Sequence, residues 1–260
     1  MSFLDAMTVQ NRAIGALMLR DMRTRVGRTF FGLAFVILGP LAQLVFLMSV
    51  YMLLRGRTAL MGTSPAVFWA TGLLPYILCL YPARTMMRSI VENRPLLSFP
   101  IIKPIDLVVA RGLVDIITCF WVTAIFCLIL LAFGVDLMPA RHGDAIAAIF
   151  ATIYLGFSLG FFGAIAFKLF RPTSIIMMIS FMVMYFSSGV FFMPTLMPPS
   201  VQDILWFNPL LHCVEWLRSA YYEGYGYGLL NRTYLFSYST LVLFLGLVLE
   251  RAARGRMLTP

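Results

Sequence analysis

Six long runs of apolar residues, each with at most one charged side chain, limit how this chain can fold. Each run is close to the roughly 20 residues that a helix needs to cross the hydrocarbon core of a membrane. Backbone polar groups in lipid must be satisfied within the segment, so each run is expected to be helical. The third run can extend back to Leu107, and the start of the last is loosely defined. The expected spans are Phe30–Leu54, Ala66–Met86, Gly112–Phe133, Ala145–Phe167, Thr173–Met193 and Leu230–Leu249.

Composition supports the same fold class. The 260 residues are 61% hydrophobic and only 12% charged, with a mean hydropathy of +0.89, which is more apolar surface than a water-soluble domain buries. The sequence therefore predicts an all-α polytopic membrane protein that forms one transmembrane domain over residues 1–260.

Arginine and lysine fix the expected orientation. With the N-terminus in the cytoplasm, fifteen of the 20 basic residues lie on the cytoplasmic side, as the positive-inside rule requires. Both termini are then cytoplasmic, and the net charge of +9 reflects topology rather than nucleic-acid binding. The five basic residues outside are Arg55, Arg57, Arg141, Arg218 and Arg232.

The sequence lacks the motifs that identify several classes of enzymes and metal-binding proteins. The only lysines, Lys103 and Lys168, do not stand in a phosphate-binding Gly-x-x-x-x-Gly-Lys-Ser/Thr loop. There is no His-Glu-x-x-His helix, no Gly-x-Ser-x-Gly turn and no paired spacing among the four cysteines. The first thirty residues lack a compact apolar core with a cleavage site, so no cleavable signal peptide is expected. We therefore expect no catalytic residue, metal or cofactor in this chain.

The segment before the first span, residues 1–29, is predicted to contain an amphipathic helix over about residues 3–26. Its apolar face would lie at the membrane interface. Such a helix serves either as a topological anchor or as a docking element for a partner. The apolar face carries Ile14, Leu17, Met18 and Met22, and the basic face carries Arg12, Arg20 and Arg23.

The cytoplasmic segment 84–111 contains an apolar patch between prolines. Leu96-Leu97-Ser98-Phe99 follows Pro95 and is bracketed by Pro100 and Pro104, which end the flanking helices. Exposed apolar residues on a rigid turn suggest a knob that enters a groove on another protein. The alternative is that they dip into the membrane interface.

The external connector 194–232 is longer than a turn requires. Pro198-Pro199-Ser200 can begin one short helix that runs through Phe207. Asn208 is a good N-cap and Pro209 suits the first turn of a second helix, which the glycines at 224, 226 and 228 end. His212, Glu215, Ser219 and Tyr222 share one face of that helix. Two short helices that turn back toward the last span suggest a re-entrant hairpin and a candidate gate.

Polar and aromatic side chains within the spans have more than one interpretation. Asp115 has Arg111 one turn away, so an ion pair is favoured over a proton relay. In the external connector, Glu215 and Arg218 are three residues apart, and a pair whose charges neutralise each other is one interpretation of them. Tyr76, Tyr81 and Tyr185 suit a path for sugars, which stack on rings and bond to hydroxyl groups. An interfacial belt or a packed core explains the same aromatic residues.

Together these features resemble ABC-2 type permeases, and most of all the capsular polysaccharide exporters of Gram-negative bacteria. The likeness covers essentially the whole chain and rests mainly on Ser187–Phe192 and on the pattern Asn-Pro-Leu-x-His-x-x-Glu-x-x-Arg that begins at Asn208. It implies a bacterial inner-membrane protein in which two permease chains pair and two separate ATPase subunits, which bind ATP and Mg²⁺, sit beneath them. A periplasmic co-polymerase and an outer-membrane export protein are possible further partners.

The resemblance also implies roles for particular residues. Spans one, two and five would line the path of a lipid-linked, acidic polysaccharide, with Arg84 and Arg88 at the inner mouth, where topology alone explains them equally well. The expected substrate channel contains Trp69, Tyr76, Tyr81, Arg84, Arg88 and Tyr185. The expected periplasmic gate contains Trp206, Asn208, His212, Glu215, Trp216, Arg218, Tyr221 and Tyr222. The expected ATPase-coupling segment contains Glu92, Arg94, Leu96, Leu97 and Phe99.

Other functions remain open at this point. Within transport, the alternatives are export of O-antigen, teichoic acid, lipid or drugs. A membrane-embedded acyl- or glycosyltransferase would need a cytosolic acid pair or an intramembrane histidine, and neither is found in the sequence. A structural scaffold for a capsule assembly complex would not need polar aromatic residues in its spans.

Overall fold

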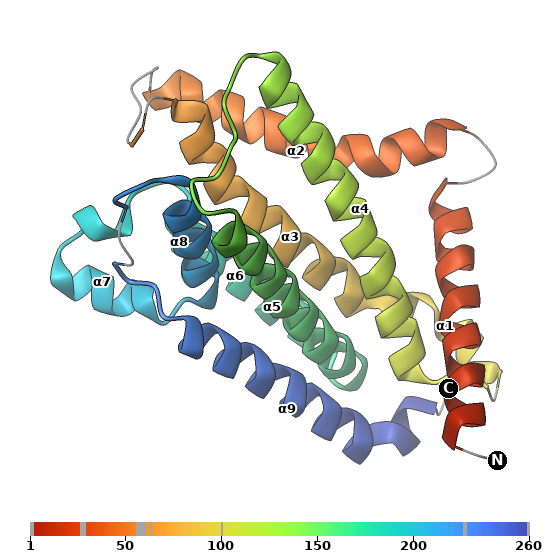
Figure 1. The fold of residues 1–260 in the computed structure, drawn as a ribbon. Helices are drawn as coiled ribbons and strands as arrows, with labels where there is room; N and C mark the ends of the chain where they lie inside the picture. The colour runs from red at the N-terminus through yellow and green to blue at the C-terminus, as the bar shows by residue number, and fades with distance from the viewer. Residues whose placement is uncertain are drawn as a thin grey trace.

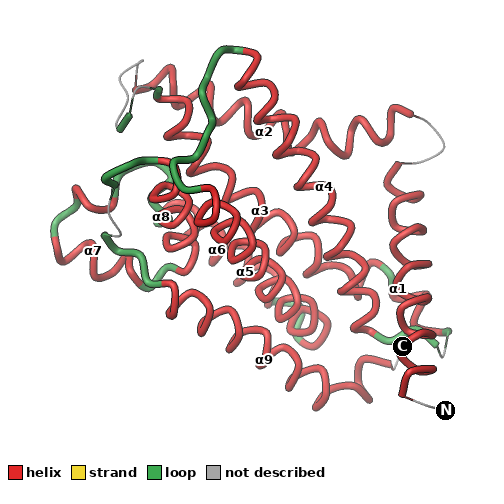
Figure 2. Tube along the Cα trace, in the orientation of Figure 1, coloured by secondary structure: helices red, strands yellow, loops and turns green. Residues whose placement is uncertain are grey.

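The computed structural model describes residues 3–26, 30–55, 61–62, 64–99, 101–225 and 228–258. Within these ranges the chain is helical with short loops and contains no strand (Figures 1 and 2). Pro100, Arg57 and Gly226, which the sequence analysis names, lie outside these ranges, as do Arg28, one of the basic residues expected on the cytoplasmic side, and Tyr227 of the external connector. The longer helices are α1 (Phe3–Val26), α2 (Phe30–Arg55), α3 (Pro65–Glu92), α4 (Pro104–Ala132), α5 (His142–Leu169) and α9 (Arg232–Leu258). The shorter elements are η1 (Arg94–Ser98), α6 (Thr173–Phe186), η2 (Pro194–Leu196), α7 (Pro199–Trp206) and α8 (Pro209–Tyr221).

Five of the described helices, α2, α3, α4, α5 and α9, are long and apolar enough to cross a membrane. This confirms a polytopic all-helical protein. The fifth expected span differs, because α6 ends at Phe186 instead of continuing to Met193. Its 14 residues rise about 21 Å, which is less than the hydrocarbon thickness of about 30 Å.

Helix α3 forms the centre of the fold. Within its membrane-length segment, 94% of the residues are buried inside the protein. It packs closely against α5 because two glycines on α5 face it. A Cβ atom on Gly156 would lie 2.5 Å from the carbonyl oxygen of Cys79, and one on Gly160 would lie 2.9 Å from the Cβ of Met86. Small residues at such positions allow helix backbones to approach one another within a membrane. The sequence analysis did not single out these glycines.

Helix α1 runs beside the lower half of α4, as Figure 1 shows, and confirms the predicted amphipathic helix over residues 3–26. Leu17 on its apolar face is buried against Leu107 and Ala110 of α4. Arg12, Arg20 and Arg23 on the opposite face are exposed. The apolar face is therefore at least partly covered by α4. The beginning of α1 and the end of α9 lie at the same end of the bundle.

Candidate functional site

Helix α8 is the best-defined candidate site, and it lies inside the protein. Every residue from Pro209 to Ala220 is buried, although the sequence predicted an amphipathic helix with one polar face beside the bilayer. The predicted start is confirmed, because the Asn208 side chain accepts a hydrogen bond from the Leu210 N–H at 2.9 Å. The Asn208 amide also donates to the Met184 carbonyl at 2.8 Å and to the Ser187 hydroxyl at 2.9 Å. One side chain thus begins α8 and attaches it to the end of α6.

Arg218 occupies the centre of this site and has no solvent-exposed surface. It donates from Nη1 to the Gly189 carbonyl at 2.7 Å and from Nη2 to the Val190 carbonyl at 3.2 Å. A longer bond of 3.4 Å reaches the Phe192 carbonyl, and the guanidinium stacks 4.0 Å over the Phe68 ring of α3. The backbone after α6 is non-helical, so its carbonyl groups need partners, and Arg218 supplies them.

Glu215 lies one helical turn from Arg218 and is also buried. Its Oε1 is 3.8 Å from Arg218 Nη1 and accepts a hydrogen bond from the Tyr225 hydroxyl at 2.7 Å. Burial raises the pKa of Glu215, while Arg218 and Tyr225 act in the opposite direction. The expected pairing of Glu215 with Arg218 is present, but backbone carbonyls form the shorter contacts of Arg218.

His212 is held in one tautomer by two backbone groups. Its Nε2 lies 2.8 Å from the Trp206 carbonyl, which can only accept, so Nε2 donates. Its Nδ1 accepts the Asn231 N–H at 3.2 Å, which leaves the ring neutral. Burial lowers the pKa of His212, while the backbone groups of Trp206 and Leu229 act in the opposite direction. His212 therefore connects α7, α8 and the start of α9.

The other residues expected at the gate surround α8. The Trp206 ring is tilted against that of Tyr234, with ring centres 4.6 Å apart, and lies edge-on to His212. The Trp216 indole donates to Asp144 at 3.4 Å. Tyr221 and Tyr222 are half-buried at the end of α8. The site also includes residues that the sequence analysis did not place there, of which Tyr225 and Phe68 make the most direct contacts.

The aromatic residues expected along a substrate path are mostly packed inside this chain. The Tyr76 and Tyr185 rings lie 4.0 Å apart, and Trp69 stacks on Tyr51 at 4.6 Å. Gln43 of α2 donates to the Tyr76 hydroxyl at 2.9 Å. Trp69, Tyr76 and Tyr185 are at most 9% exposed, so within a single chain they form a core that includes polar groups. Their lining of a path in an assembly stays a prediction.

The remaining residues of the expected path lie farther along α3. Tyr81 and Arg84 are half-buried, and Arg88 is exposed. They share a helix with Trp69 and Tyr76 but lie toward its other end, so the structure does not bring all six expected path residues into one cluster.

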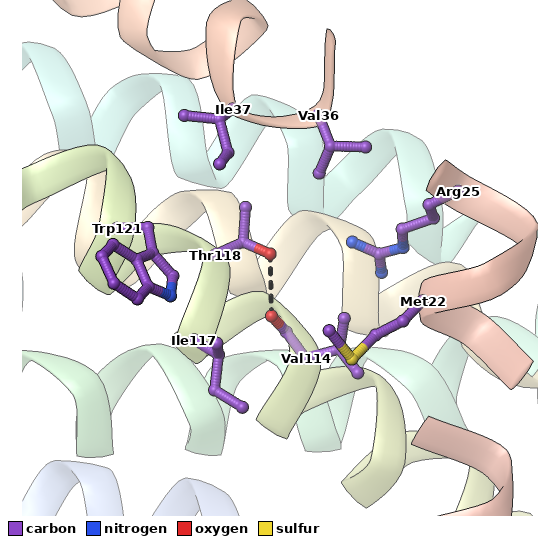
Figure 3. A pocket seen from close by; sticks show the side chains of 8 residues that line it. All are labelled: Met22, Arg25, Val36, Ile37, Val114, Ile117, Thr118 and Trp121. Carbon is purple, nitrogen blue, oxygen red and sulfur yellow. Dashed lines mark hydrogen bonds between the residues drawn. The ribbon is translucent and has the colours of Figure 1, made fainter. Parts of the chain in front are cut away.

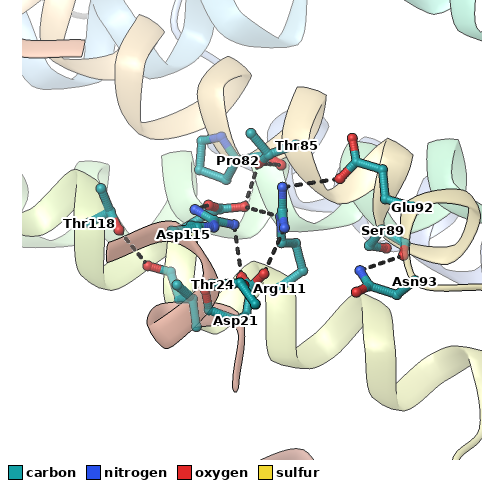
Figure 4. Close-up of polar contacts among 12 residues, drawn as sticks. Asp21, Thr24, Pro82, Thr85, Ser89, Glu92, Asn93, Arg111, Asp115 and Thr118 are labelled. Carbon is teal, nitrogen blue, oxygen red and sulfur yellow. Dashed lines mark hydrogen bonds and ion pairs between the residues drawn. The ribbon is translucent and has the colours of Figure 1, made fainter. Parts of the chain in front are cut away.

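A second polar cluster joins α1, α3 and α4 at the opposite end of α3 (Figure 4). Asp115 is fully buried and lies 2.5 Å from Arg25 Nη1, and it also accepts a hydrogen bond from the Thr85 hydroxyl. Arg111 lies 2.7 Å from Asp21 and 3.3 Å from Glu92. The expected pair of Arg111 with Asp115 is present at 3.8 Å, but it is the longest of these contacts.

Only the Arg111–Asp115 pair of this cluster was predicted from the sequence. Arg111 and Asp115 are one turn apart, whereas Asp21 and Arg25 stand ninety residues from their partners on α4. A further bond, from the Gln10 amide to Asp106 at 2.8 Å, connects α1 to the start of α4. Charged groups therefore hold α1 against α4 and the end of α3.

Next to this cluster, the segment with the expected coupling knob forms the single 3₁₀ turn η1. Leu96 and Leu97, which the sequence analysis expected to be exposed, are half-buried, because both pack partly against the cluster that contains Leu17 of α1 and Leu107 of α4. A 3₁₀ turn repeats every three residues, so it cannot expose all its apolar residues on one side. Phe99 is exposed, at 58%, as are Arg94 and Glu92. Ile101, which is 64% exposed, extends this apolar tip.

Neither cluster has the composition of a metal centre. No group of three or more His, Cys, Asp or Glu that could hold a metal ion occurs among the described residues. The two clusters hold helices together. Arg218 and Asn208 attach α8 to the end of α6, while Arg25 and Arg111 attach α1 to α4.

Comparison with known proteins finds one family model and several relatives that this chain resembles over most of its length. The family model described as ABC-2 type transporter matches residues 12–222. The polysialic acid transport protein KpsM of Escherichia coli is 29% identical over 251 residues, which cover 96% of this chain and 97% of that protein. The capsule polysaccharide export inner-membrane protein CtrC of Neisseria meningitidis serogroup B is 26% identical over 95% of this chain and 93% of its own. BexB of Haemophilus influenzae, a protein of the same description, is 26% identical over 85% of this chain and 83% of its own.

Proposed function

The chain belongs to the ABC-2 type transporter family, and from this premise we propose that it is the membrane permease of an ATP-driven exporter of capsular polysaccharide. One observation carries the proposal: the similarity to a polysaccharide transport protein extends over 96% of this chain and 97% of that protein. The substrate would be a lipid-linked, acidic polysaccharide that crosses the bacterial inner membrane.

The proposed assembly is a pair of these chains on two ATPase subunits, which bind ATP and Mg²⁺. The chain itself would supply no bond-breaking chemistry. Both termini would face the cytoplasm, which agrees with the position of α1 and the end of α9 at one end of the bundle (Figure 1). α6 would form the sixth crossing together with the chain that follows it, and α7 and α8 would form a re-entrant hairpin on the periplasmic side.

In the proposed mechanism, the exposed tip at Phe99 and Ile101 enters a groove on the ATPase. Closure of the ATPases would move η1, and the ion pairs of Arg111 with Glu92 and Asp21 would carry this movement to α3 and α1. α3 reaches from Glu92 to Phe68, over which Arg218 stacks, a distance of about 36 Å along an ideal helix. One continuous helix would thus connect the coupling segment with the periplasmic gate.

Deletion of the gene in its native bacterium tests the proposal. Export requires the permease, so lipid-linked polysaccharide is expected to accumulate in the cytoplasm while the cell surface loses its coat. The plasmid-borne wild-type gene should restore the coat. A complete surface coat in the deletion strain would contradict polysaccharide export and favour a lipid or drug exporter.

The coupling segment has its own test in the same strain. Phe99→Asp places a charge on the exposed apolar tip and should abolish both export and co-purification of the ATPase while the permease remains folded. Met138→Asp is a matched control, because Met138 is 75% exposed in the loop between α4 and α5. Normal ATPase binding by the Phe99→Asp variant would contradict the assignment.

A further inference from the structure

The end of α8 is covered by the connector between α2 and α3. Gly62 of that connector lies against the ring of Tyr222, the C-cap of α8, and a Cβ atom on Gly62 would lie 2.6 Å from Cε1 of the ring. Gly62 also has a φ of +71°, a left-handed conformation that favours glycine. Its neighbour Met61 packs partly against the main hydrophobic core. Glycine is thus the residue that fits where this connector meets α8.

The position of Tyr222 suits its ring but not its hydroxyl group. The ring packs on Gly62, whereas the hydroxyl oxygen is buried and has no hydrogen-bond partner among the described residues. Burial raises the pKa of Tyr222 to about 12, so the hydroxyl is protonated at neutral pH and needs an acceptor. An unsatisfied buried donor costs free energy that a hydrogen bond elsewhere would recover. The ring therefore holds Tyr222 in this position, and the hydroxyl favours its release.

Tyr222 lies beside the buried polar cluster of α8. Its ring centre is 6.5 Å from that of Tyr225, whose hydroxyl donates to Glu215 at 2.7 Å. The charge of Arg218 lowers the pKa of Tyr222, against the larger effect of burial. The contact with Gly62 therefore joins the connector after α2 to the cluster around Arg218.

Helix α2, which leads into this connector, is loosely packed against α4. A cavity of about 400 Å³ lies between Val36 of α2 and Val114 and Trp121 of α4, as Figure 3 shows. A second cavity of about 400 Å³ lies between Met52 of α2 and Phe126 of α4. The contact between these helices is thus interrupted near both ends of α2, and a segment with few buried apolar contacts moves at low cost. A shift of α2 would move the connector that carries Gly62.

We propose that Gly62 and Tyr222 form a latch, by which the connector after α2 holds the end of α8 and releases it when α2 shifts. On release, the Tyr222 ring leaves Gly62 and its hydroxyl gains a hydrogen bond to water. Both are positioning residues, and neither needs to touch the polysaccharide. The role of the latch in transport rests on the proposed function, in which α8 belongs to the periplasmic gate.

Hydrogen–deuterium exchange of the full-length protein in lipid nanodiscs tests the latch without ATPase or polysaccharide. Gly62→Ala places a Cβ against the Tyr222 ring and should speed amide exchange over residues 216–222 several-fold. Gly134→Ala is the matched control, because Gly134 has a φ of +76° but a Cβ there would meet nothing within 4 Å. It shares the backbone strain without the contact, so exchange in α8 should stay at the wild-type rate.

Two variants of Tyr222 separate its ring from its hydroxyl. Tyr222→Ala removes the ring and should speed exchange about as much as Gly62→Ala does, and the double variant should exchange little faster than either. Tyr222→Phe keeps the ring and removes the unpaired hydroxyl, so exchange should stay at or below the wild-type rate. This pair of variants decides the matter if Gly62→Ala does not fold.

Wild-type exchange in Gly62→Ala or in Tyr222→Ala would overturn the latch, as would faster exchange in Tyr222→Phe. Export is then measured in the deletion strain, where Gly62→Ala should lower it, because the gate no longer closes, and Gly134→Ala should not. Normal export by a Gly62→Ala variant whose α8 exchanges faster would overturn the role of the latch in gating. Polysaccharide export itself is decided separately, by the deletion strain that carries the wild-type gene.

Discussion

The guanidinium of Arg218 donates to the carbonyl oxygen of Gly189 at 2.7 Å, and this bond joins α8 to the backbone beyond α6. Gly189 has a φ of +77°, a left-handed conformation that turns the chain out of the helical path. A Cβ there would lie 2.7 Å from the Pro194 ring. The break after α6 and the buried arginine are therefore parts of one arrangement.

Removal of the Arg218 charge should destabilise the fold strongly. Arg218→Met leaves the Glu215 carboxylate buried without its cation and leaves three carbonyl groups without a donor, at a cost of about 3–5 kcal/mol. Thermal unfolding of the purified protein in detergent measures the loss. Arg94→Met, at an exposed position, is the control and should stay within about 0.5 kcal/mol of wild type.

A double variant separates the contribution of the Glu215–Arg218 ion pair from that of the carbonyl hydrogen bonds of Arg218. Arg218→Met combined with Glu215→Gln removes both charges, so it should recover part of the stability that Arg218→Met loses. Double-variant stability equal to that of Arg218→Met would mean that the carbonyl contacts, not the ion pair, account for the whole effect.

Neutralisation of Asp115 should release α1 from α4. Asp115→Asn keeps the shape of the side chain but removes the charge that binds Arg25 at 2.5 Å. Loss of one partner of a buried pair costs about 3–5 kcal/mol, and here the loss falls on the contact between two helices. Limited proteolysis should cleave α1 faster in this variant. The control is Asp203→Asn, an exposed residue of α7, and equal cleavage rates in both variants would contradict the prediction.

The helices themselves were largely predictable from the sequence. The amphipathic pattern of residues 3–26 and the Asn208-Pro209 start of α8 are local signals, and both matched the structure. Caps and periodicity depend on residues within a turn or two of each other, so a sequence reveals them directly.

The environment of these helices was less predictable, because it depends on contacts between distant residues. The polar residues of α8 indicated a surface, yet the partners of Arg218 are carbonyl groups, which have no side-chain signature. The ion pair of Arg25 with Asp115 was not predictable either, because the two residues are ninety positions apart in the sequence. For the end of α6, the local signal within the apolar stretch from Thr173 to Met193 was the short run Ser187-Ser188-Gly189.

Close packing between α3 and α5 should depend on Gly156. In Gly156→Ala the new Cβ would meet backbone atoms of Cys79 at 2.5–3.0 Å, which forces the two helices apart. We expect a loss of about 1–3 kcal/mol in thermal unfolding experiments. Gly143→Ala is a control on the same helix, because its Cβ would meet nothing within 4 Å. A loss no larger than that of the control would show that α3 and α5 can adjust.

The stability of the α8 region should fall in mild acid because of His212. Its folded-state pKa is lowered, chiefly by burial, so below about pH 6.5 the unfolded chain binds more protons than the folded one. Protonated Nδ1 would also face the Asn231 N–H, which donates to it in the neutral state. The melting temperature of the wild type should therefore drop between pH 7.5 and pH 5.5.

A comparison of variants isolates this effect from other groups. The raised pKa of Glu215 acts with the opposite sign, because the folded state then binds the extra proton as the pH falls. His212→Gln should thus lose most of the acid destabilisation relative to wild type, although it is less stable at pH 7.5. His142→Gln, at an exposed histidine, should keep the wild-type pH dependence. If His212→Gln retains the wild-type slope, acid sensitivity arises elsewhere and His212 is not the group that titrates.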